Sequence, residues 1–309
     1  MKLFDFHCDT ASLILDKKSD LYSNSHDISL EKAAVYENYA QVTACYQSKR
    51  FSDAIGWERF TAMSDALFAQ VDKYADKVTM IRHGSEILPA WESGKAAFIL
   101  SIEDARILDG DLSRIDYLAA RGVRIVTILW GGDTCIGGSH NTENGLTDFG
   151  KAVVRRLFEV GIIPDISHAS EKSADDVEEI AREVGKPFIA SHSCAYGVRA
   201  HSRNLRDRHL QAIIDLGGIV GMSICPPHLA KENANAETVA DHIEYYLAHG
   251  AGDVLCMGCD LDGTDLPEGF SDIRDLEKIA DVLRRRGHSE ATIEKIFWRN
   301  ALAFAQKNI

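Results

Sequence analysis

The stretch FDFHCDT at residues 4–10 places His7 and Asp9 two positions apart at the end of a short apolar run. Alternate residues of a strand point to the same face, so we expect the two side chains to lie together. Imidazole and carboxylate groups are good zinc ligands. A single pair of this kind is a weak signal, and its value depends on partners elsewhere in the chain.

Four further residues able to bind a metal or move a proton end later apolar runs: Glu103, His168, His192 and Asp260. Buried strands usually avoid such side chains, because an unpaired buried charge is costly. Three histidines and two acids are enough to hold two metal ions. Glu103 is the natural bridge, since a carboxylate has two oxygens to share. Two divalent ions against two carboxylates leave a positive pocket that lowers the pKa of a bound water.

Asp260 lies in the sequence GCDLDGTD, after the last apolar run. A carboxylate beside an activated water can take its proton and pass it to a leaving group. A helix cap or a third metal ligand is the alternative role. The surrounding acids do not form an EF-hand, because the downstream spacing and the bidentate glutamate are missing.

The apolar runs alternate with helical patterns along the chain. Such alternation indicates a parallel sheet covered by helices, and eight strands predict a (β/α)8 TIM barrel of the α/β class, with chemistry at the carboxyl ends of its strands. A doubly wound sheet is the alternative, but no GxGxxG follows the first run. The predicted strands are 2–9, 40–47, 96–103, 123–130, 161–168, 187–193, 217–224 and 254–260, with 77–83 as a peripheral ninth, and the predicted helices are 113–122, 148–161, 173–185, 237–250 and 272–287.

Composition restricts the class of protein. The 309 residues are 45% hydrophobic and carry a formal net charge of −13, which argues against nucleic acid as a partner. We expect one domain over residues 1–309, without a signal peptide or a membrane span. Seven scattered cysteines suggest reduced thiols in a cytoplasm. Cys256 and Cys259 have CxxC spacing, but we expect them on opposite faces of a strand and assign them no metal or redox role.

Arg203 lies in the polar stretch SHSCAYGVRAHSRNL, which we interpret as the loop after the sixth strand. An arginine fork suits a substrate carboxylate because it binds both oxygens. Spacing alone does not separate Arg203 from Arg199, Arg206 and Arg208. We expect the remaining histidines, among them His140 and His209, to be on the surface or structural.

Five segments together resemble the membrane (renal) dipeptidase family of zinc metallopeptidases, within the amidohydrolase-type barrels. They are DFHCDT, SIEDA, GLTDFGKAVVRRLFEVGIIPDISHAS, SHSCAYGVRAHSRN and MGCDLDGT, which occur in the family's order, and the resemblance extends from residue 3 to about 305. The HxD start is similar to this family rather than to relatives that begin with HxH.

The resemblance implies two Zn²⁺ ions, although the same ligands accept other divalent metals. His7, Asp9 and Glu103 would hold one ion, and Glu103, His168 and His192 the other. Asp260 would be the proton shuttle for a metal-bridged hydroxide, and Arg203 would bind the carboxylate of a dipeptide substrate. Family members accept short substrates, and many tolerate a D-residue at the C-terminal position. Relatives often form homodimers.

Three segments depart from the family pattern. Trp130, in TILWGGD, stands near the point where the family often has a histidine, which touches the substrate, or a Trp-Asn element. Cys225 and His228, in SICPPHL, replace an aromatic NFYPP-like segment, and Trp298-Arg299 replaces small residues. We therefore expect an altered substrate pocket. No C-terminal lipid-anchor signal is present.

The sequence thus favours a cytoplasmic zinc dipeptidase acting on small dipeptides. Trp130 and Cys225 motivate an alternative, a related metallohydrolase acting on an N-acyl amino acid or a lactone. A catalytically silent metal-binding barrel is a second alternative, and the complete ligand set with Asp260 argues against it.

Overall fold

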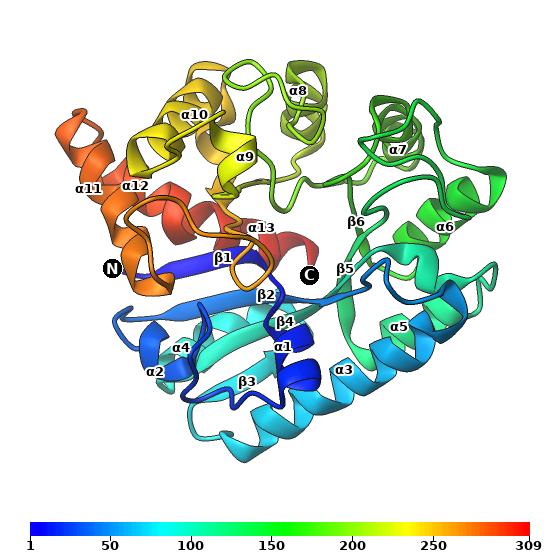
Figure 1. Cartoon of the computed structure of the whole chain (residues 1–309), viewed down its shortest axis with the longest axis horizontal. Coiled ribbons are helices and arrows are strands. Elements are labelled where there is room, and N and C mark those ends of the chain that lie inside the picture. The colour runs from blue at the N-terminus through cyan, green and yellow to red at the C-terminus, as the bar shows by residue number, and fades with distance from the viewer.

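The computed structural model describes residues 1–309, apart from the side chain of Ala54. Its centre is a curled, wholly parallel sheet whose strands follow the order β6-β5-β4-β2-β1-β8-β7, with β3 paired to β4 (Figure 1). The strands are β1 (Leu3–Cys8), β2 (Tyr39–Tyr46), β3 (Val78–Ile81), β4 (Ala96–Glu103), β5 (Val123–Thr127), β6 (Ile163–Asp165), β7 (Val220–Met222) and β8 (Leu255–Met257).

The gap between β6 and β7 is bridged by a segment that the sequence analysis treats as a full strand. Residues 187–193 make only two isolated parallel bridges, from Ile189 to Asp165 and from Ala190 to Val220. The prediction of a strand there is wrong in extent, because the backbone N–H groups of Ser191 and His192 donate to the side chains of Asp165 and Ser167 instead of to a neighbouring strand. These two bridges nevertheless connect β6 to β7, so the strands form a closed barrel. The predicted TIM-barrel type of fold is confirmed, and the doubly wound alternative is not.

β3 confirms the prediction of a peripheral ninth strand. It pairs with the first half of β4, from Val78 opposite Ala96 to Ile81 opposite Ile99. β5 pairs with the second half of β4 instead. β3 therefore extends the sheet at the base of the barrel, away from the carboxyl ends of the strands.

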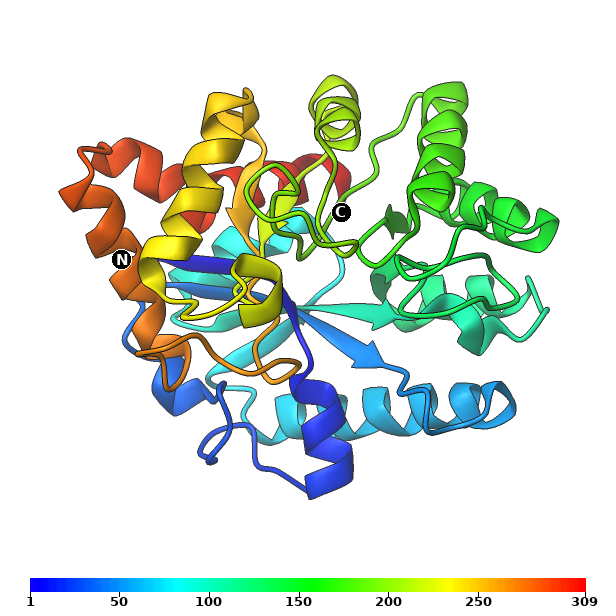
Figure 2. The same ribbon diagram turned by 45° about the horizontal axis from the view of Figure 1, so that its top comes forward.

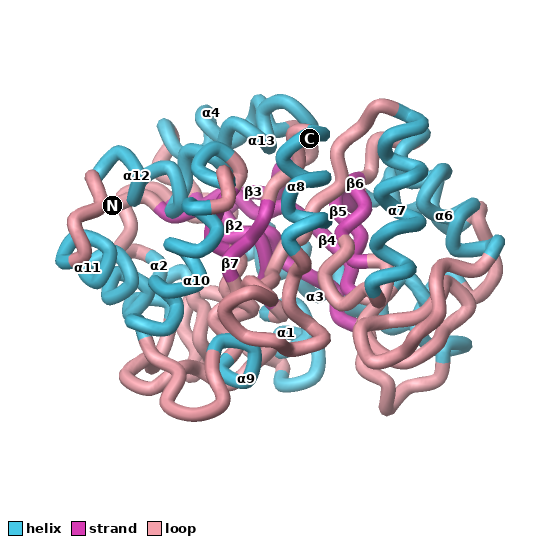
Figure 3. The backbone as a smooth tube through the Cα atoms, turned by 90° about the horizontal axis from the view of Figure 1, so that it is seen from above, coloured by secondary structure: helices cyan, strands magenta, loops and turns pink.

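Helices surround the strands, as the view from above shows (Figure 3). The long α3 (light blue) runs beneath the sheet beside α1 (dark blue), against which it packs (Figure 2). The helices are α1 (Thr10–Lys17), α2 (Leu30–Ala33), α3 (Asp53–Lys73), α4 (Ile87–Glu92), α5 (Arg114–Arg121), α6 (Asp148–Glu159), α7 (Glu171–Val184), α8 (Asp207–Leu216), α9 (Pro226–Leu229), α10 (Ala236–Ala248), α11 (Glu277–Arg285), α12 (Glu290–Glu294) and α13 (Asn300–Asn308), and Lys295–Arg299 forms a π-helical turn.

Local signals explain several helix ends. α7 begins after Ser170, whose hydroxyl accepts from the backbone N–H of Ser173, and it ends at Gly185 in the left-handed conformation. Gly122 ends α5 in the same way, with φ of 100°. The helix predicted over 272–287 is divided, since Ile273–Leu276 is a 3-10 turn ahead of α11.

Two apolar clusters form the core. The inner cluster contains Phe4, Phe6 and Ile99 from the strands and Phe304 from α13, so α13 closes the base of the barrel. The outer cluster joins the strands to the surrounding helices. Cys256 belongs to the inner cluster and Cys259 to the outer one, which confirms that this pair faces opposite sides.

Among the described residues, no helix combines the length and apolar character needed to span a membrane.

Candidate metal centre

The five predicted ligands converge at the carboxyl ends of the strands. Two come from β1 and the turn that follows it, one ends β4, one follows β6, and one lies in the bridging segment. Within this set the structure defines two groups of three whose ligand atoms lie within 4.8 Å of one another, and Glu103 belongs to both. The residues are His7, Asp9, Glu103, His168 and His192.

The first group is tight and consists of Glu103, His168 and His192, hereafter the tight group. Glu103 Oε1 lies 3.0 Å from His168 Nε2 and 3.4 Å from His192 Nε2. The two Nε2 atoms are 3.0 Å apart. A tetrahedral zinc ion with ligands at its usual bond lengths separates them by about 3.4 Å. The tight group therefore fits a metal ion with little rearrangement.

The second group is wider and consists of His7, Asp9 and Glu103, hereafter the wide group. His7 Nε2 lies 3.8 Å from Asp9 Oδ1 and 3.7 Å from Glu103 Oε2. Both His7 Nε2 and Asp9 Oδ1 are buried without a hydrogen-bond partner in the described part of the chain. Unpartnered buried polar atoms are costly, so these two atoms are suited to an ion. Because Glu103 turns one oxygen to each group, it has the bridging geometry that the sequence predicts.

Gly263 allows the wide group to form. A Cβ at this position would lie 2.5 Å from Asp9 Oδ2 and 2.6 Å from Asp260 Oδ1, closer than real Cβ contacts. Only glycine leaves room for the two carboxylates at this point. The segment GCDLDGT gives no local signal of this role for its glycine, which depends on Asp9 at the other end of the chain.

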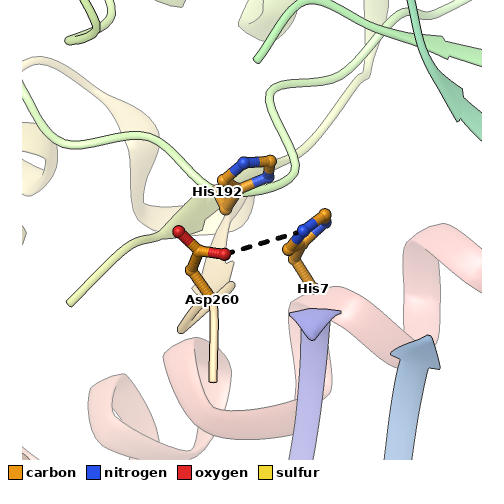
Figure 4. Close-up of side chains that lie close together, drawn as sticks. All are labelled: His7, His192 and Asp260. Carbon is orange, nitrogen blue, oxygen red and sulfur yellow. Dashed lines mark ion pairs between the residues drawn. The ribbon is translucent and has the colours of Figure 1, made fainter. Parts of the chain in front are cut away.

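Asp260 faces the centre from the chain segment after β8. Its Oδ1 lies 3.7 Å from His7 Nε2, and the His192 ring, which stacks on that of His7, is drawn above both (Figure 4). The geometry also allows Asp260 to join His7 and His192 as a ligand, which was the alternative role. Burial, together with the charge of Glu103, raises the pKa of the Asp260 carboxyl to about 7. A group with this pKa can exchange a proton near neutral pH.

Burial dominates the electrostatics of the centre. It raises the pKa of Glu103 to about 8 and that of Asp9 well above its usual value, where the charge of Glu103 adds to the effect. Burial, with the nearby charge of Arg203, lowers the pKa of His168 and of His192. The lowered pKa of His168 and His192 favours their neutral form, which a metal ligand requires, and the crowded carboxylates favour a divalent cation.

Asp5 is a buried carboxylate in β1 that holds the backbone around His7 in place. Asp5 Oδ1 accepts from the backbone N–H of His7 and from Gln41 Nε2, both at 3.0 Å, and Oδ2 accepts from the N–H of Cys259 at 2.9 Å. Asp5 thus ties β1 to β2 and to the segment after β8. A charged residue inside the apolar run LFDFH was the available signal.

Arg203 differs from the nearby arginines in its burial and its hydrogen-bond partners. Its side chain is buried, with Nη1 donating to Ser193 Oγ at 3.2 Å and Nη2 to the carbonyl of His192 at 3.0 Å. Its Nε has no partner among the described atoms. Arg206 and Arg208 instead pair with Glu171 away from the centre. Of the four arginines Arg203 alone is buried, and its charge acts on Glu103 and Asp260.

Trp130 and Cys225 occupy the surroundings of the centre. The Trp130 ring lies 6.0 Å from the His168 ring and packs on Tyr46 at 5.1 Å. Cys225 is buried, and its Sγ accepts from Thr264 Oγ1 at 3.0 Å.

Of the two other histidines named in the sequence analysis, His140 lies near the centre and His209 pairs elsewhere. The ring of His140 is 6.0 Å from that of His168, so the expectation of a purely surface or structural role missed its position. Its proximity arises from the loop after Trp130, whose course the sequence does not reveal. His209 conforms to expectation, since its Nε2 pairs with Asp175 at 2.8 Å.

A parallel barrel with histidines and carboxylates gathered at the carboxyl ends of its strands is the arrangement of a metal-dependent hydrolase. A family model described as membrane dipeptidase (peptidase family M19) matches residues 1–307. The chain belongs to this family of metallopeptidases, which implies a metal cofactor and a small peptide substrate.

Similar proteins agree with the family. The Klebsiella pneumoniae uncharacterized protein in the pqqA 5′ region is 28% identical over 241 residues, which are 74% of this chain and 88% of that protein. Dipeptidase tcpJ of Claviceps purpurea (strain 20.1) is 29% identical over 266 residues, covering 82% of this chain and 61% of that protein. A metallopeptidase from Rhodobacter sphaeroides, liganded with a phosphinate mimic of L-Ala-D-Ala, shares the fold with a TM-score of 0.92 at 21% identity, covering 100% and 99% of the two chains.

Proposed function

We propose that the chain is a dipeptidase that hydrolyses the peptide bond of short dipeptides, including those with a D-residue at the C-terminal position. The observation that carries this proposal is the pair of ligand groups sharing Glu103, with the buried Arg203 beside them. Family membership supports the reaction, and the L-Ala-D-Ala mimic bound by the Rhodobacter sphaeroides relative supports the substrate class.

Two divalent ions, which we propose to be zinc, would be held by the tight and wide groups. The unpartnered atoms His7 Nε2 and Asp9 Oδ1 support this, as do the short separations in the tight group. When bound, such ions supply Lewis acidity that lowers the pKa of water and stabilises negative charge on a scissile carbonyl. Manganese or cobalt would suit the same ligands.

Asp260 moves the proton in this proposal. Its carboxylate accepts a proton from the attacking water and delivers it to the amine that leaves. The raised pKa of about 7 supports the role, because a carboxylate with a much lower pKa would be a weaker base and would take the proton from water less readily. The oxygen nearest the metal ligands is Oδ1, at 3.7 Å from His7.

Arg203 orients the substrate by binding its C-terminal carboxylate. The unpartnered Nε and the fixed Nη atoms leave a rigid, positively charged donor. An anchor that close to the ligand groups restricts how much chain fits between the carboxylate and the scissile bond. This restriction favours dipeptides over longer peptides.

An N-acyl amino acid is the second candidate substrate. It carries the same carboxylate for Arg203 but replaces the amino-terminal residue with an apolar acyl group. The indole of Trp130, packed against Tyr46, favours such a group. A lactone lacks the carboxylate that Arg203 would bind.

The test is release of free amino acids from a panel of LL and LD dipeptides by the zinc-loaded protein, with N-acetyl amino acids beside them and a chelator control. Chelator-sensitive cleavage of dipeptides is the expected result. Cleavage of the N-acetyl compounds alone would replace the proposed substrate with the second candidate. If the protein binds metal and cleaves none of these compounds, it is a metal-binding barrel without catalytic activity.

The cellular location and the assembly are further proposals. We propose a cytoplasmic protein, supported by seven cysteines that are free in the described structure. We also propose a homodimer, which size-exclusion chromatography with light scattering would test.

A further inference from the structure

We propose that Asp165 and Ser191 position His192 by fixing which of its ring nitrogens carries the proton. The inference rests on the proposed metal centre, in which His192 belongs to the tight group. It concerns residues outside both ligand groups, and it assigns them a role in metal affinity and not in contact with substrate.

Asp165 is the last residue of β6 and is fully buried. Its Oδ1 accepts from the backbone N–H groups of Ser167 and Ser191, both at 2.9 Å. Its Oδ2 accepts from the hydroxyls of Thr127 and Ser191. Four donors therefore surround one carboxylate, which joins β5, β6 and the bridging segment.

These bonds determine the direction of the next one. A carboxylate surrounded by four donors accepts only, so the hydroxyl proton of Ser191 points to Asp165. The remaining lone pairs of Ser191 Oγ face His192 Nδ1 at 2.7 Å. Nδ1 must then carry the hydrogen and donate it. In a neutral imidazole the other nitrogen, Nε2, is left with a free lone pair.

The free lone pair of His192 Nε2 lies beside the other two ligand atoms of the tight group. His192 Nε2 is 3.4 Å from Glu103 Oε1 and 3.0 Å from His168 Nε2. A metal-binding histidine whose other nitrogen donates to a carboxylate or to an intermediate acceptor is held in both tautomer and orientation. Here Ser191 transmits the effect of Asp165 to the ring.

His168, the other histidine of the tight group, has no such relay. Its Nδ1 is buried without a hydrogen-bond partner among the described residues. Its backbone is instead placed by a left-handed conformation, with φ of 71°, and by its carbonyl, which accepts from the N–H of His140 at 2.7 Å. The tautomer control is therefore specific to His192.

The sharpest variant is Asp165→Asn, which keeps the volume. The amide oxygen at the Oδ1 position still accepts from the two backbone N–H groups. The amide nitrogen at the Oδ2 position donates to the hydroxyl of Ser191 and turns the hydroxyl proton toward His192 Nδ1. This places the ring hydrogen on Nε2, where it blocks metal binding.

Ser191→Ala and Thr127→Val form a matched pair. Each removes one hydroxyl donor from the same carboxylate oxygen, but only Ser191 also contacts His192. A role confined to the packing of Asp165 would make the two variants equivalent. A positioning role separates them.

The experiment measures zinc affinity of the metal-free proteins by competition with a chromophoric chelator, with thermal unfolding as the check on folding. We expect Asp165→Asn and Ser191→Ala to lower the affinity for one of the two zinc ions by about 10–100-fold. Thr127→Val should bind both ions with nearly the affinity of the parent protein. Equal affinity in all four proteins, or equal weakening in Ser191→Ala and Thr127→Val, would overturn the inference. A parent protein that binds no zinc would instead overturn the proposed function.

Discussion

The tight and wide groups share Glu103 yet are held in different ways. In the tight group the ligand atoms are 3.0–3.4 Å apart, and His192 is fixed through Ser191 to a buried carboxylate. In the wide group the separations are 3.7–3.8 Å, and two of the ligand atoms have no hydrogen-bond partner in the described structure. One half of the centre is organised before an ion arrives, while the other half depends on the ion.

This difference implies unequal affinity. A preorganised site loses less free energy in ordering its ligands, so the tight group is expected to retain its ion longer. The wide group lies next to Asp260, where proton movement is proposed. The proton transfer proposed for Asp260 therefore falls in the looser half of the centre.

Replacing the shared ligand is expected to have the largest effect, because it removes the connection between the groups. Glu103→Gln retains the volume but exchanges one oxygen for an amide nitrogen, which cannot bind a cation. Loss of about 4 kcal/mol of charge stabilisation corresponds to a fall in kcat/KM of about 1,000-fold. Steady-state kinetics with metal analysis tests this. A variant retaining two ions and full turnover would show that the groups do not share Glu103.

Asp260→Asn tests whether Asp260 belongs to neither group. We expect both ions to remain bound while kcat falls by about 100–10,000-fold, the usual range for a lost general acid or base. Metal content and kcat are measured on the same preparation. Loss of one ion would reassign Asp260 as a ligand of the wide group, and an unchanged kcat would remove it from the mechanism.

Gly263→Ala should disturb the wide group alone. The added methyl lies against Asp9 and Asp260, so we expect one ion to bind about 10–100-fold more weakly. The ion held by His168 and His192 should be unaffected. Chelator competition resolves the two affinities, and Gly252→Ala, at a position where an added Cβ meets open space, is the control. Equal weakening of both ions would contradict the separation of the groups.

The smallest expected effect is the change with pH in the stability of the metal-free protein. Folding raises the pKa of Glu103 to about 8 and that of Asp260 to about 7, from about 4 in the unfolded chain. Between pH 4 and 8 the folded state therefore holds protons that the unfolded state has released, so stability falls as pH rises through this window.

The measurement is the unfolding temperature with and without zinc. We expect zinc to raise Tm more at pH 8.5 than at pH 5.5, because the ion replaces protons on the buried acids. Glu103→Gln removes one of the titrating groups and should flatten the pH dependence of the metal-free Tm. A zinc effect independent of pH would argue against ionised carboxylates as the ligands.

Much of the candidate centre could be predicted because ligands at strand ends leave a local signature. His7, Glu103 and Asp260 each end an apolar run, and parallel strands bring such ends together. The family resemblance was needed to choose Arg203, which the structure distinguishes by burial.

Other features could not be predicted because they depend on contacts distant in sequence. Asp5 and Asp165 look like interruptions of apolar runs until the donors that surround them are known. The bridging segment after residue 187 has the composition of a strand, but the backbone N–H of Ser191 donates to Asp165 instead of extending the ladder. The course of the loop that brings His140 to His168 likewise has no local signal.

The closure of the barrel base by α13 has a consequence for how the protein is made. β1 is synthesised first, yet its neighbours include β8, through Asp5 and Met257, and the inner cluster that contains Phe304. During translation β1 must wait for residues nearly 300 positions later before its apolar side chains are covered. Among the strands of this fold β1 is thus made first and gains its complete set of native neighbours last.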